Sequence, residues 1–245
     1  MGKIATEEQI SLLLTQLLTN DKEINDKLEA KIAEAIASIT IPEPTSAKSR
    51  WYNKKWYAVG DSFTQLGTYV GYLNQYIGFS SYYNAGQNGK GMSAMTSKFT
   101  TESLANYDLV TVLCGTNDYA DSRELGSISD TSSSNTFYGY TKKVIETIIQ
   151  QNPKITIAFF TPTIRGAYST NPVYPAKNSA GYGLEDYADA IIKVCNEYAV
   201  PVCDTFRTSQ INTLNLSTLT SDNLHPNNLG AQILARKMWG FLETI

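Results

Sequence analysis

The sequence is poorest in histidine, with one residue of this type, His225, among 245. A zincin HExxH pair, a two-histidine iron site and a zinc finger each need more histidine than one chain supplies here. We therefore expect no metal and no other cofactor. Cysteine is also scarce. Cys114, Cys195 and Cys203 each lie in an apolar run, and so small and odd a set predicts buried apolar residues instead of a disulfide framework.

Charge and long apolar runs are equally limited. The chain has 20 basic and 23 acidic residues, a net charge of -3 and a pI near 5.3, so it has no electrostatic footprint for nucleic acid. No apolar stretch reaches the roughly 18 residues that span a bilayer. The N-terminus lacks the charged start, apolar core and cleavage site of a signal peptide. We expect a soluble, unprocessed chain with no nucleic-acid partner and no membrane insertion.

Residues 6–40 carry one apolar stripe at helical spacing and contain no glycine or proline. Such a stripe needs a partner to cover it, and near-heptad spacing rich in Ile and Leu favours pairing with copies of the same helix. We predict a coiled coil within residues 1–40 that makes a homo-oligomer, with a trimer favoured. The alternative is a helix that folds back on the rest of the chain. The stripe consists of Ile10, Leu14, Leu17, Ile24, Leu28, Ile32, Ile36 and Ile39.

Pro42 and Pro44 end this pattern and mark residues 41–50 as a linker. Over residues 51–245, short apolar strands alternate with longer helical patterns. This alternation predicts one α/β domain, a parallel sheet of about five strands with helices on both faces. The expected strands are 56–60, 79–84, 109–114, 155–160 and 200–203. The expected helices are 65–77, 137–151, 184–198 and 229–242.

Residues with useful chemistry follow the expected strands, where ligands bind in open parallel sheets. The first strand ends in Gly60-Asp61-Ser62, which places Ser62 at a strand-to-helix turn where helix amides favour negative charge. Its plain alternative is a helix N-cap. The next loop, residues 85–91, is glycine-rich and includes Gly89. Its amides can approach a reacting atom closely, although a flexible turn explains it equally well.

The remaining two loops complete a set of catalytic groups. Asn117, in Gly115-Thr116-Asn117-Asp118, can donate to an oxyanion, although alone this sequence is typical of an Asx turn. Asp222 and His225 precede the final helix, and a turn can bring carboxylate and imidazole together. With Ser62, these residues predict a serine hydrolase. The chain has no Gly-x-Ser-x-Gly elbow, which excludes the α/β-hydrolase version.

The four blocks, in this order, resemble the SGNH hydrolases, also called the GDSL esterase/lipase family, over residues 51–245. The resemblance implies a three-layer α/β/α fold of flavodoxin-like topology, no metal, and hydrolysis of esters or thioesters. Phe63 stands where the family has its eponymous leucine, which affects packing behind the serine more than the chemistry. Asp61 and Asp118 adjoin the catalytic positions, and by resemblance they hold their loops through backbone hydrogen bonds.

The resemblance also implies a role for each matching position. Ser62 corresponds to the nucleophile, His225 to the general base and Asp222 to its orienting acid. The oxyanion hole corresponds to the amides of Ser62 and Gly89 and the side chain of Asn117.

The substrate must be chosen by the loops, since fold and triad do not select the acyl group. Residues 119–136 and 161–183 are rich in Tyr, Ser, Asn, Gly and Thr instead of the Leu, Ile and Phe of a lipase trough. We predict a carbohydrate O-acetylesterase that acts on a cell-surface polysaccharide. Four tyrosines offer flat faces with polar tips that suit a sugar, although loop packing would use them as well. They are Tyr119, Tyr168, Tyr174 and Tyr182.

An oligomerising helix, a proline spacer and a glycan-active enzyme together resemble bacteriophage tail or baseplate components. A virion-associated or extracellular location is therefore favoured over a cytoplasmic one, and a secreted bacterial enzyme without its leader fits the same pattern. Two other functions stay open. One is a non-catalytic glycan-binding or structural tail module. The other is an acyl-thioesterase or lysophospholipase of the same fold, which would prefer chains longer than acetyl.

Overall fold

The computed structural model describes residues 21–24, 26–27, 48–99 and 104–245 of a chain that divides into two units, Met1–Ala47 and Lys48–Ile245. In the first unit the described residues are helical, and Lys27 Nζ lies 2.8 Å from Glu23 Oε1 one turn away. Most of the predicted coiled coil and residues 41–47 of the predicted linker lie outside the described residues. The coiled coil and the trimer therefore stay predictions.

The second unit is built on a five-stranded parallel sheet in the order β2-β1-β3-β4-β5. This is the strand order of flavodoxin-like folds and confirms the predicted α/β class. The central strand β3 reads Leu-Val-Thr-Val-Leu and is buried along its whole length, as expected for a strand covered on both faces. The strands are β1 (Lys55–Gly60), β2 (Ser81–Asn84), β3 (Leu109–Leu113), β4 (Thr156–Phe160) and β5 (Val202–Cys203).

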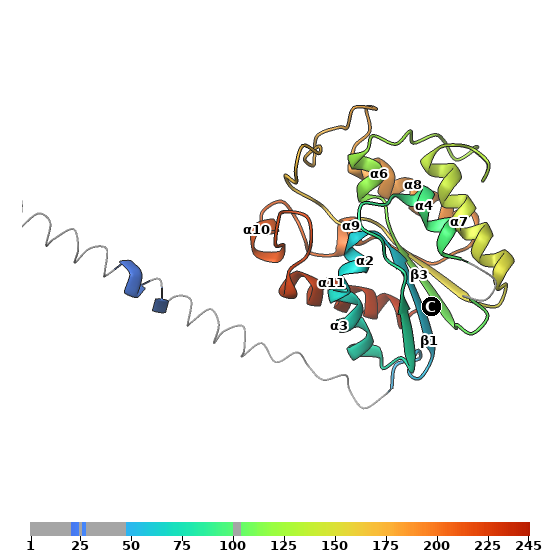
Figure 1. The fold of residues 1–245 in the computed structure, drawn as a ribbon, viewed down its shortest axis with the longest axis horizontal. Helices are drawn as coiled ribbons and strands as arrows, with labels where there is room; N and C mark the ends of the chain where they lie inside the picture. Colours follow the sequence, from blue (N-terminus) through green and yellow to red (C-terminus); the bar gives the residue numbers. More distant parts are fainter. Residues whose placement is uncertain (1–20, 25, 28–47, 100–103) are drawn as a thin grey trace, which may run out of the picture. The chain divides into compact units, whose positions relative to one another are not determined.

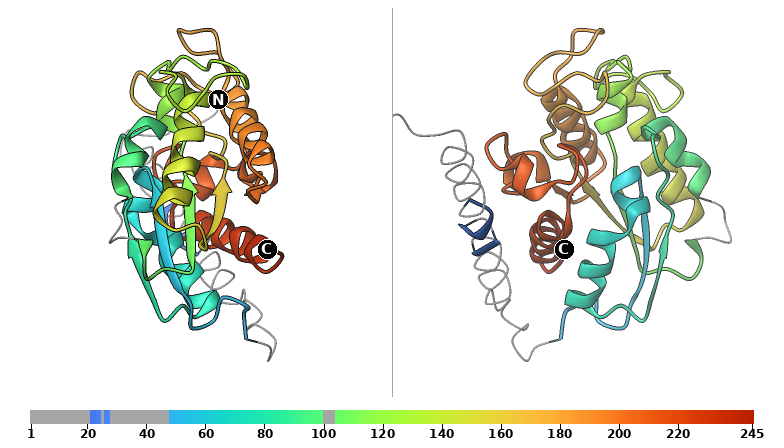
Figure 2. Two further views of the ribbon diagram at one scale, coloured as in Figure 1. Left: turned by 90° about the vertical axis from the view of Figure 1, so that its right-hand side faces the viewer. Right: turned by 60° about the vertical axis from the view of Figure 1, so that its left-hand side comes forward.

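Helices cover both faces of this sheet, which gives the expected three layers (Figures 1 and 2). On one face α3 packs against α11, and on the other α7 packs against α4 and α8. Trp56 and Tyr57, neighbours on β1, point to opposite faces as strand geometry requires, Trp56 onto Phe79 and Tyr57 onto Phe99. The longer helices are α3 (Thr68–Ile77), α7 (Phe137–Gln151), α8 (Leu184–Glu197) and α11 (Asn228–Leu242).

Short helices fill the connections between these elements. They are α2 (Ser62–Leu66), α4 (Met92–Met95), the 3-10 helix η1 (Thr96–Lys98), α6 (Thr116–Ala120), α9 (Thr205–Thr208) and α10 (Leu216–Leu219). No helix of the described residues is long and apolar enough to cross a membrane. Cys114, Cys195 and Cys203 are free and buried, as predicted.

One predicted helix is interrupted. The sequence predicts a single helix over 65–77, whereas α2 ends at Leu66 and α3 begins at Thr68. Gly67 lies between them with φ +77°, and its N–H donates to Thr64 O. Glycine adopts the left-handed conformation that ends a helix at less cost than any other residue. Ser62 therefore lies on a short helix of its own.

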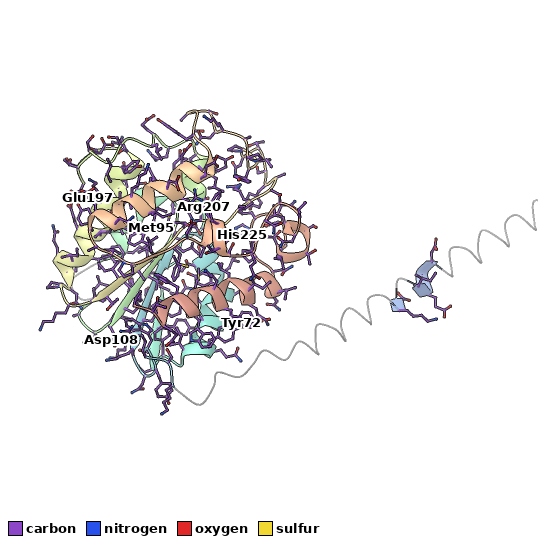
Figure 3. The ribbon with its side chains drawn as sticks, turned by 180° about the vertical axis from the view of Figure 1, so that it is seen from behind. Tyr72, Met95, Asp108, Glu197, Arg207 and His225 are labelled. Carbon is purple, nitrogen blue, oxygen red and sulfur yellow. The ribbon has the colours of Figure 1, made fainter. Side chains whose placement is uncertain are left out.

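The loops that follow the strands converge at one end of the sheet. Figure 3 shows His225 at this end and Asp108, which precedes β3, at the opposite end. Residues 121–136 and 161–183, the two long polar loops, also lie at the end where His225 is found (Figures 1 and 3). The chemistry predicted from the sequence is thus gathered at the carboxyl ends of the strands.

Candidate active site

Ser62 opens helix α2 directly after β1. The side chain of Asp61 caps this helix by accepting from Phe63 N at 3.0 Å, and Gln65 N donates to Asp61 O at 3.0 Å. Ser62 itself is 6% exposed. The sequence therefore places one hydroxyl at a helix N-terminus, while the neighbouring aspartate provides the cap.

His225 and Asp222 meet Ser62 through a continuous set of hydrogen bonds. Ser62 Oγ lies 2.8 Å from His225 Nε2, and His225 Nδ1 lies 2.7 Å from Asp222 Oδ2. The second carboxylate oxygen, Asp222 Oδ1, accepts from the backbone of Leu224 at 3.1 Å and of His225 at 2.7 Å. With Nδ1 protonated toward the acid, Nε2 is left to accept the serine proton.

The electrostatics of Asp222 favour its charged form. Partial burial raises the pKa of Asp222, but hydrogen bonds and the charge of His225 lower it, and the net shift is downward. An ionised carboxylate can hold the imidazole in one orientation and stabilise the imidazolium that forms when the ring takes a proton.

Local turn geometry explains why these two residues meet at a spacing of three. Ser221 N donates to His225 O at 2.9 Å, and Thr220 forms an antiparallel bridge with Pro226. Asn223, inside the turn, has φ +64°, a conformation that asparagine tolerates better than most residues. The acid–base pair is therefore built by a short stretch of chain.

Asn117 lies in the first turn of α6, after β3. Its Nδ2 donates one hydrogen to Lys90 O at 3.1 Å, which orients the amide and leaves its second hydrogen free to donate elsewhere. Gly89 has φ +67°, and a Cβ there would meet nothing within 4 Å, so glycine serves the turn and not close packing. Among the described residues, the amides of Ser62 and Gly89 have no hydrogen-bond acceptor.

Asp61 and Asp118 are buried beside this site and hold its loops. Asp118 accepts from Met92 N at 3.1 Å and 2.9 Å with its two oxygens. Burial raises the pKa of Asp118 to about 6 and that of Asp61 to about 7. These contacts agree with the structural role that the resemblance implies for both residues.

The four predicted sugar-binding tyrosines have different surroundings. Tyr168 is 37% exposed, and its ring meets that of His225 edge-on at 5.4 Å. The prediction for Tyr119 is wrong, because its ring is fully buried and its hydroxyl donates to Ala176 O at 2.6 Å. Tyr174 and Tyr182 are half-buried, packed against Phe206 and Tyr187, and their role stays a prediction.

Arg165, which the sequence analysis did not single out, is fully buried beside the site. Its Nη1 donates to the carbonyl and hydroxyl oxygens of Thr116 at 3.2 Å each. The next residue, Gly166, donates its N–H to Asn223 O at 2.7 Å. Residues 165–166 thus connect the loop of Asn117 with the loop of Asp222 and His225. An arginine within a long polar loop, after a buried strand, is the only signal the sequence offers for this role.

No group of three His, Cys, Asp or Glu side chains in the described part of the chain is arranged to hold a metal ion. The residues of the site offer a serine hydroxyl, an imidazole–carboxylate pair and amide donors. Such a set can transfer an acyl group to the serine and then to water.

Several solved structures share the fold of the second unit. The solved structure of a Lactobacillus plantarum protein has 25% identity and a TM-score of 0.72, covering 79% of this chain and 98% of that one. A possible lipase from Chitinophaga pinensis shares the fold, with 23% identity, a TM-score of 0.65 and coverages of 76% and 96%. A mutant acetyl-xylooligosaccharide esterase from Geobacillus Stearmophilus does so with 18% identity, a TM-score of 0.55 and coverages of 78% and 94%. No curated protein matches the chain.

A family model covers most of the second unit. The model of the GDSL-like lipase/acylhydrolase family matches residues 58–233, which include Ser62, Asn117, Asp222 and His225. The chain therefore belongs to the GDSL-like lipase/acylhydrolase family, hydrolases that act on esters.

Proposed function

We propose that this protein is a serine esterase that removes O-acetyl groups from a cell-surface polysaccharide. The observation that carries the catalytic part is the unbroken hydrogen-bond chain from Asp222 through His225 to Ser62, at 2.7 Å and 2.8 Å. A nucleophile, a base and an orienting acid in these positions form the minimum set for acyl transfer through a covalent intermediate.

In the first half of the reaction, Ser62 Oγ attacks the ester carbonyl carbon while its proton moves to His225 Nε2. The carbonyl oxygen gains negative charge, which the amides of Ser62 and Gly89 and the free hydrogen of Asn117 Nδ2 stabilise. Collapse of this intermediate breaks the bond to the sugar oxygen. His225 gives its proton to that oxygen, so the sugar leaves as an alcohol and the acetyl group stays on Ser62.

In the second half, water attacks the acetyl-serine. His225 Nε2 takes a proton from the water, and the same donors stabilise the second oxyanion. Acetate leaves, and the proton on His225 returns to Ser62 Oγ. Throughout, Asp222 holds the imidazole in place and stays ionised, consistent with its lowered pKa.

The sugar part of the proposal has separate support. The loops at the catalytic end, residues 121–136 and 161–183, are polar, and Tyr168 presents an exposed ring beside His225. An aromatic ring with a polar tip suits a sugar face. The Geobacillus Stearmophilus protein of the same fold acts on acetyl-xylooligosaccharide. A polysaccharide at a cell surface would also suit the virion-associated or extracellular location expected from the sequence.

Catalysis is tested with p-nitrophenyl acetate, four single variants and one double variant. Ser62→Ala and His225→Ala should each lower kcat by about 10⁴-fold or more, and the double variant should add little, because the two residues act as a unit. Asp222→Asn should cost less. Asn117→Ala should lower kcat by roughly 10²- to 10³-fold with little change in KM, because its donor acts on charge present only in the transition state. Near wild-type turnover by His225→Ala would contradict the mechanism, since the chain has no second histidine.

The acyl group and its carrier are tested separately. Among p-nitrophenyl esters from acetate to decanoate, acetate should be hydrolysed fastest. Acetate release from acetylated polysaccharides is then measured to identify the carrier. A clear preference for long chains would instead favour the thioesterase or lysophospholipase alternative. No turnover of any ester by the folded wild type would favour a non-catalytic glycan-binding module.

A further inference from the structure

A groove of about 620 Å³ lies along the edge strand β2, and Ser62, Asp222 and His225 are not part of its lining. Its lining comes from β1, β2, η1 and the segment that precedes β3. Because β2 is at the edge of the sheet, no further strand of residues 48–99 or 104–245 covers this side. The groove is therefore open at the surface, and the proposed reaction steps do not involve its lining residues.

Aromatic rings form part of the lining. The rings of Tyr57 and Tyr83 stack with centroids 5.2 Å apart, and Tyr107 meets Tyr57 edge-on at 5.1 Å. Tyr57 is buried and its hydroxyl donates to Lys98 O at 2.7 Å, which ties η1 to the sheet. Tyr83 is 53% exposed. A supported, half-exposed ring in a groove is suited to stacking against the apolar face of a sugar.

The charge of the lining is positive, although the whole chain carries -3. Lys55 and Lys98 both line the groove, and neither ammonium pairs with a carboxylate among residues that the structure describes. Asp108 accepts from the backbone N–H of Lys55 at 2.8 Å, but the ammonium group it pairs with is that of Lys54, whose Nζ lies 3.6 Å away. Two ammonium groups in the lining of one groove attract an anionic ligand.

One end of the groove adjoins the candidate oxyanion hole. Ala85 and Gly86 are part of the lining, and Gly89 follows Gly86 by three residues, so their Cα atoms are at most about 11 Å apart. Asn88 N also donates to the side chain of Gln65 on α2, which holds this loop against the helix that begins with Ser62. A chain-like ligand in the groove can therefore extend toward the serine.

From these features we infer that the groove binds an anionic saccharide chain, with a ring of the chain on Tyr83 and its acidic groups at Lys55 and Lys98. This names an acidic polysaccharide as the substrate class and rests on the proposed function, because it treats the groove as the binding site for sugars that flank the acetylated one.

The test uses the full-length Ser62→Ala variant, so that nothing is hydrolysed during binding. Isothermal titration calorimetry compares hexagalacturonate with its fully methyl-esterified form, which differ in charge but not in length. The acid form should bind at least about tenfold more tightly at low salt, and about 0.5 M sodium chloride should remove most of this difference. Equal affinity for the two forms would overturn the inference.

Variants in the same background locate the binding. Tyr83→Ala and the pair Lys55→Met with Lys98→Met should each weaken hexagalacturonate binding on the order of tenfold. The matched controls are Tyr52→Ala, an exposed tyrosine outside the groove, and Lys154→Met, an exposed lysine before β4. Both controls should bind as the parent does. Binding that survives the groove variants would place the anionic chain elsewhere and overturn the inference.

Failure of this inference is distinct from failure of the proposed function. Turnover of p-nitrophenyl acetate by the wild type, without charge-dependent binding in the groove, would overturn the inference and keep the esterase. Charge-dependent binding that Tyr83→Ala weakens, in a wild type that hydrolyses no ester, would support the groove and overturn the esterase.

Discussion

At the scale of single residues, the least expected feature is the buried guanidinium of Arg165. Its Nη1 is bonded to Thr116, while Nε and Nη2 have no protein partner among the described residues. Burial lowers the pKa of Arg165, although the nearby carboxylates of Asp61 and Asp222 act in the opposite direction. Burying a charge is costly unless it is paired. Arg165 is therefore better explained by the loops it joins than by stability.

Replacing Arg165 should lower turnover more than substrate binding. Arg165→Met should reduce kcat for p-nitrophenyl acetate by roughly 10- to 100-fold with KM changed less than about threefold, because the Asn117 loop loses its anchor. Arg165→Lys keeps the charge but not the forked donor, and its kcat should lie between those of the wild type and Arg165→Met. Arg207→Met is the control, since Arg207 pairs with Asp204 and Asp189 at the surface. A folded Arg165→Met protein with wild-type kcat would contradict this role.

The buried carboxyl group of Asp118 should make stability depend on pH. Burial raises its pKa from 3.8 to about 6. Between about pH 4 and 6 the folded protein therefore keeps a proton that the unfolded chain has released. Rising pH in this window should lower the free energy of unfolding, by an amount on the order of 3 kcal/mol for this group. The contribution is thus greatest at low pH and is lost as pH rises.

Urea unfolding of the wild type and of Asp118→Asn, measured from about pH 4 to 7, checks this sign. The difference between the two unfolding free energies should change through the window, because Asp118 titrates and the asparagine does not. It should level off above about pH 6, where Asp118 is ionised in both the folded and the unfolded protein. If the unfolding free energies of the two proteins change with pH in parallel, Asp118 has the same pKa in the folded and unfolded states, which would contradict this prediction. Asp61 remains in both proteins, but the charge of Asp118 contributes to its raised pKa, so Asp118→Asn should also lower the pKa of Asp61.

At the scale of elements, the close contact between the 85–91 loop and α2 positions the serine. A Cβ on Gly86 would come within 2.1 Å of Gln65 N and 2.6 Å of Thr64 C, which are backbone atoms of α2. Backbone atoms move only with their whole helix, and α2 begins at Ser62. Glycine at position 86 is therefore required by close approach.

Gly86→Ala should accordingly lower both stability and turnover. We expect a loss of about 1–3 kcal/mol in urea unfolding, typical of overpacking, together with a reduced kcat because α2 shifts. Gly71→Ala is the matched control, since it lies inside α3 and a Cβ there meets nothing within 4 Å. Alanine should raise stability at that helical position by about 0.5–1 kcal/mol. If both variants unfold like the wild type, the packing of the loop on α2 is looser than described.

Element boundaries show where sequence pattern is a weaker guide. Phe79 continues the apolar run of the second expected strand, yet β2 starts only at Ser81. Phe79 and Ser80 are not part of a strand, although Ser80 N already donates to the carbonyl oxygen of Lys54, the residue before β1, at 2.9 Å. Apolar character predicts burial, and Phe79 is buried, but strand pairing depends on the register with β1. The sequence does not contain that register locally.

At the scale of the whole molecule, the association predicted from residues 6–40 has a direct test. The full-length protein should be an oligomer, a trimer by preference, in light scattering. A shorter protein beginning at Lys48 retains the whole second unit and should be a monomer that still hydrolyses p-nitrophenyl acetate. Its action on a polysaccharide should fall, because linked sites raise effective concentration without new contacts. A monomeric full-length protein would contradict the coiled coil.

The candidate catalytic residues could be found from the sequence because their geometry is largely local. Asp222 and His225 meet within one short turn. Ser62 begins the helix that follows β1, and Asn117 lies in the first turn of the helix that follows β3. Alternating strands and helices predict a parallel sheet, and a parallel sheet brings all its strand ends to one edge. The order of the blocks along the chain was therefore enough to predict that these residues converge.

Only the tertiary structure decided which polar and aromatic side chains are buried. Tyr119 follows the same loop as Asn117 yet points into the core, and Arg165 reaches Thr116 across 49 positions of sequence. The Tyr83 ring gains its support from Tyr57, a residue of the neighbouring strand. Burial is set by which distant residues pack around a side chain, and a local pattern does not specify them. For this reason the convergence of Ser62, Asp222 and His225 could be predicted from the sequence, whereas the contacts of Arg165 and the groove beside β2 could not.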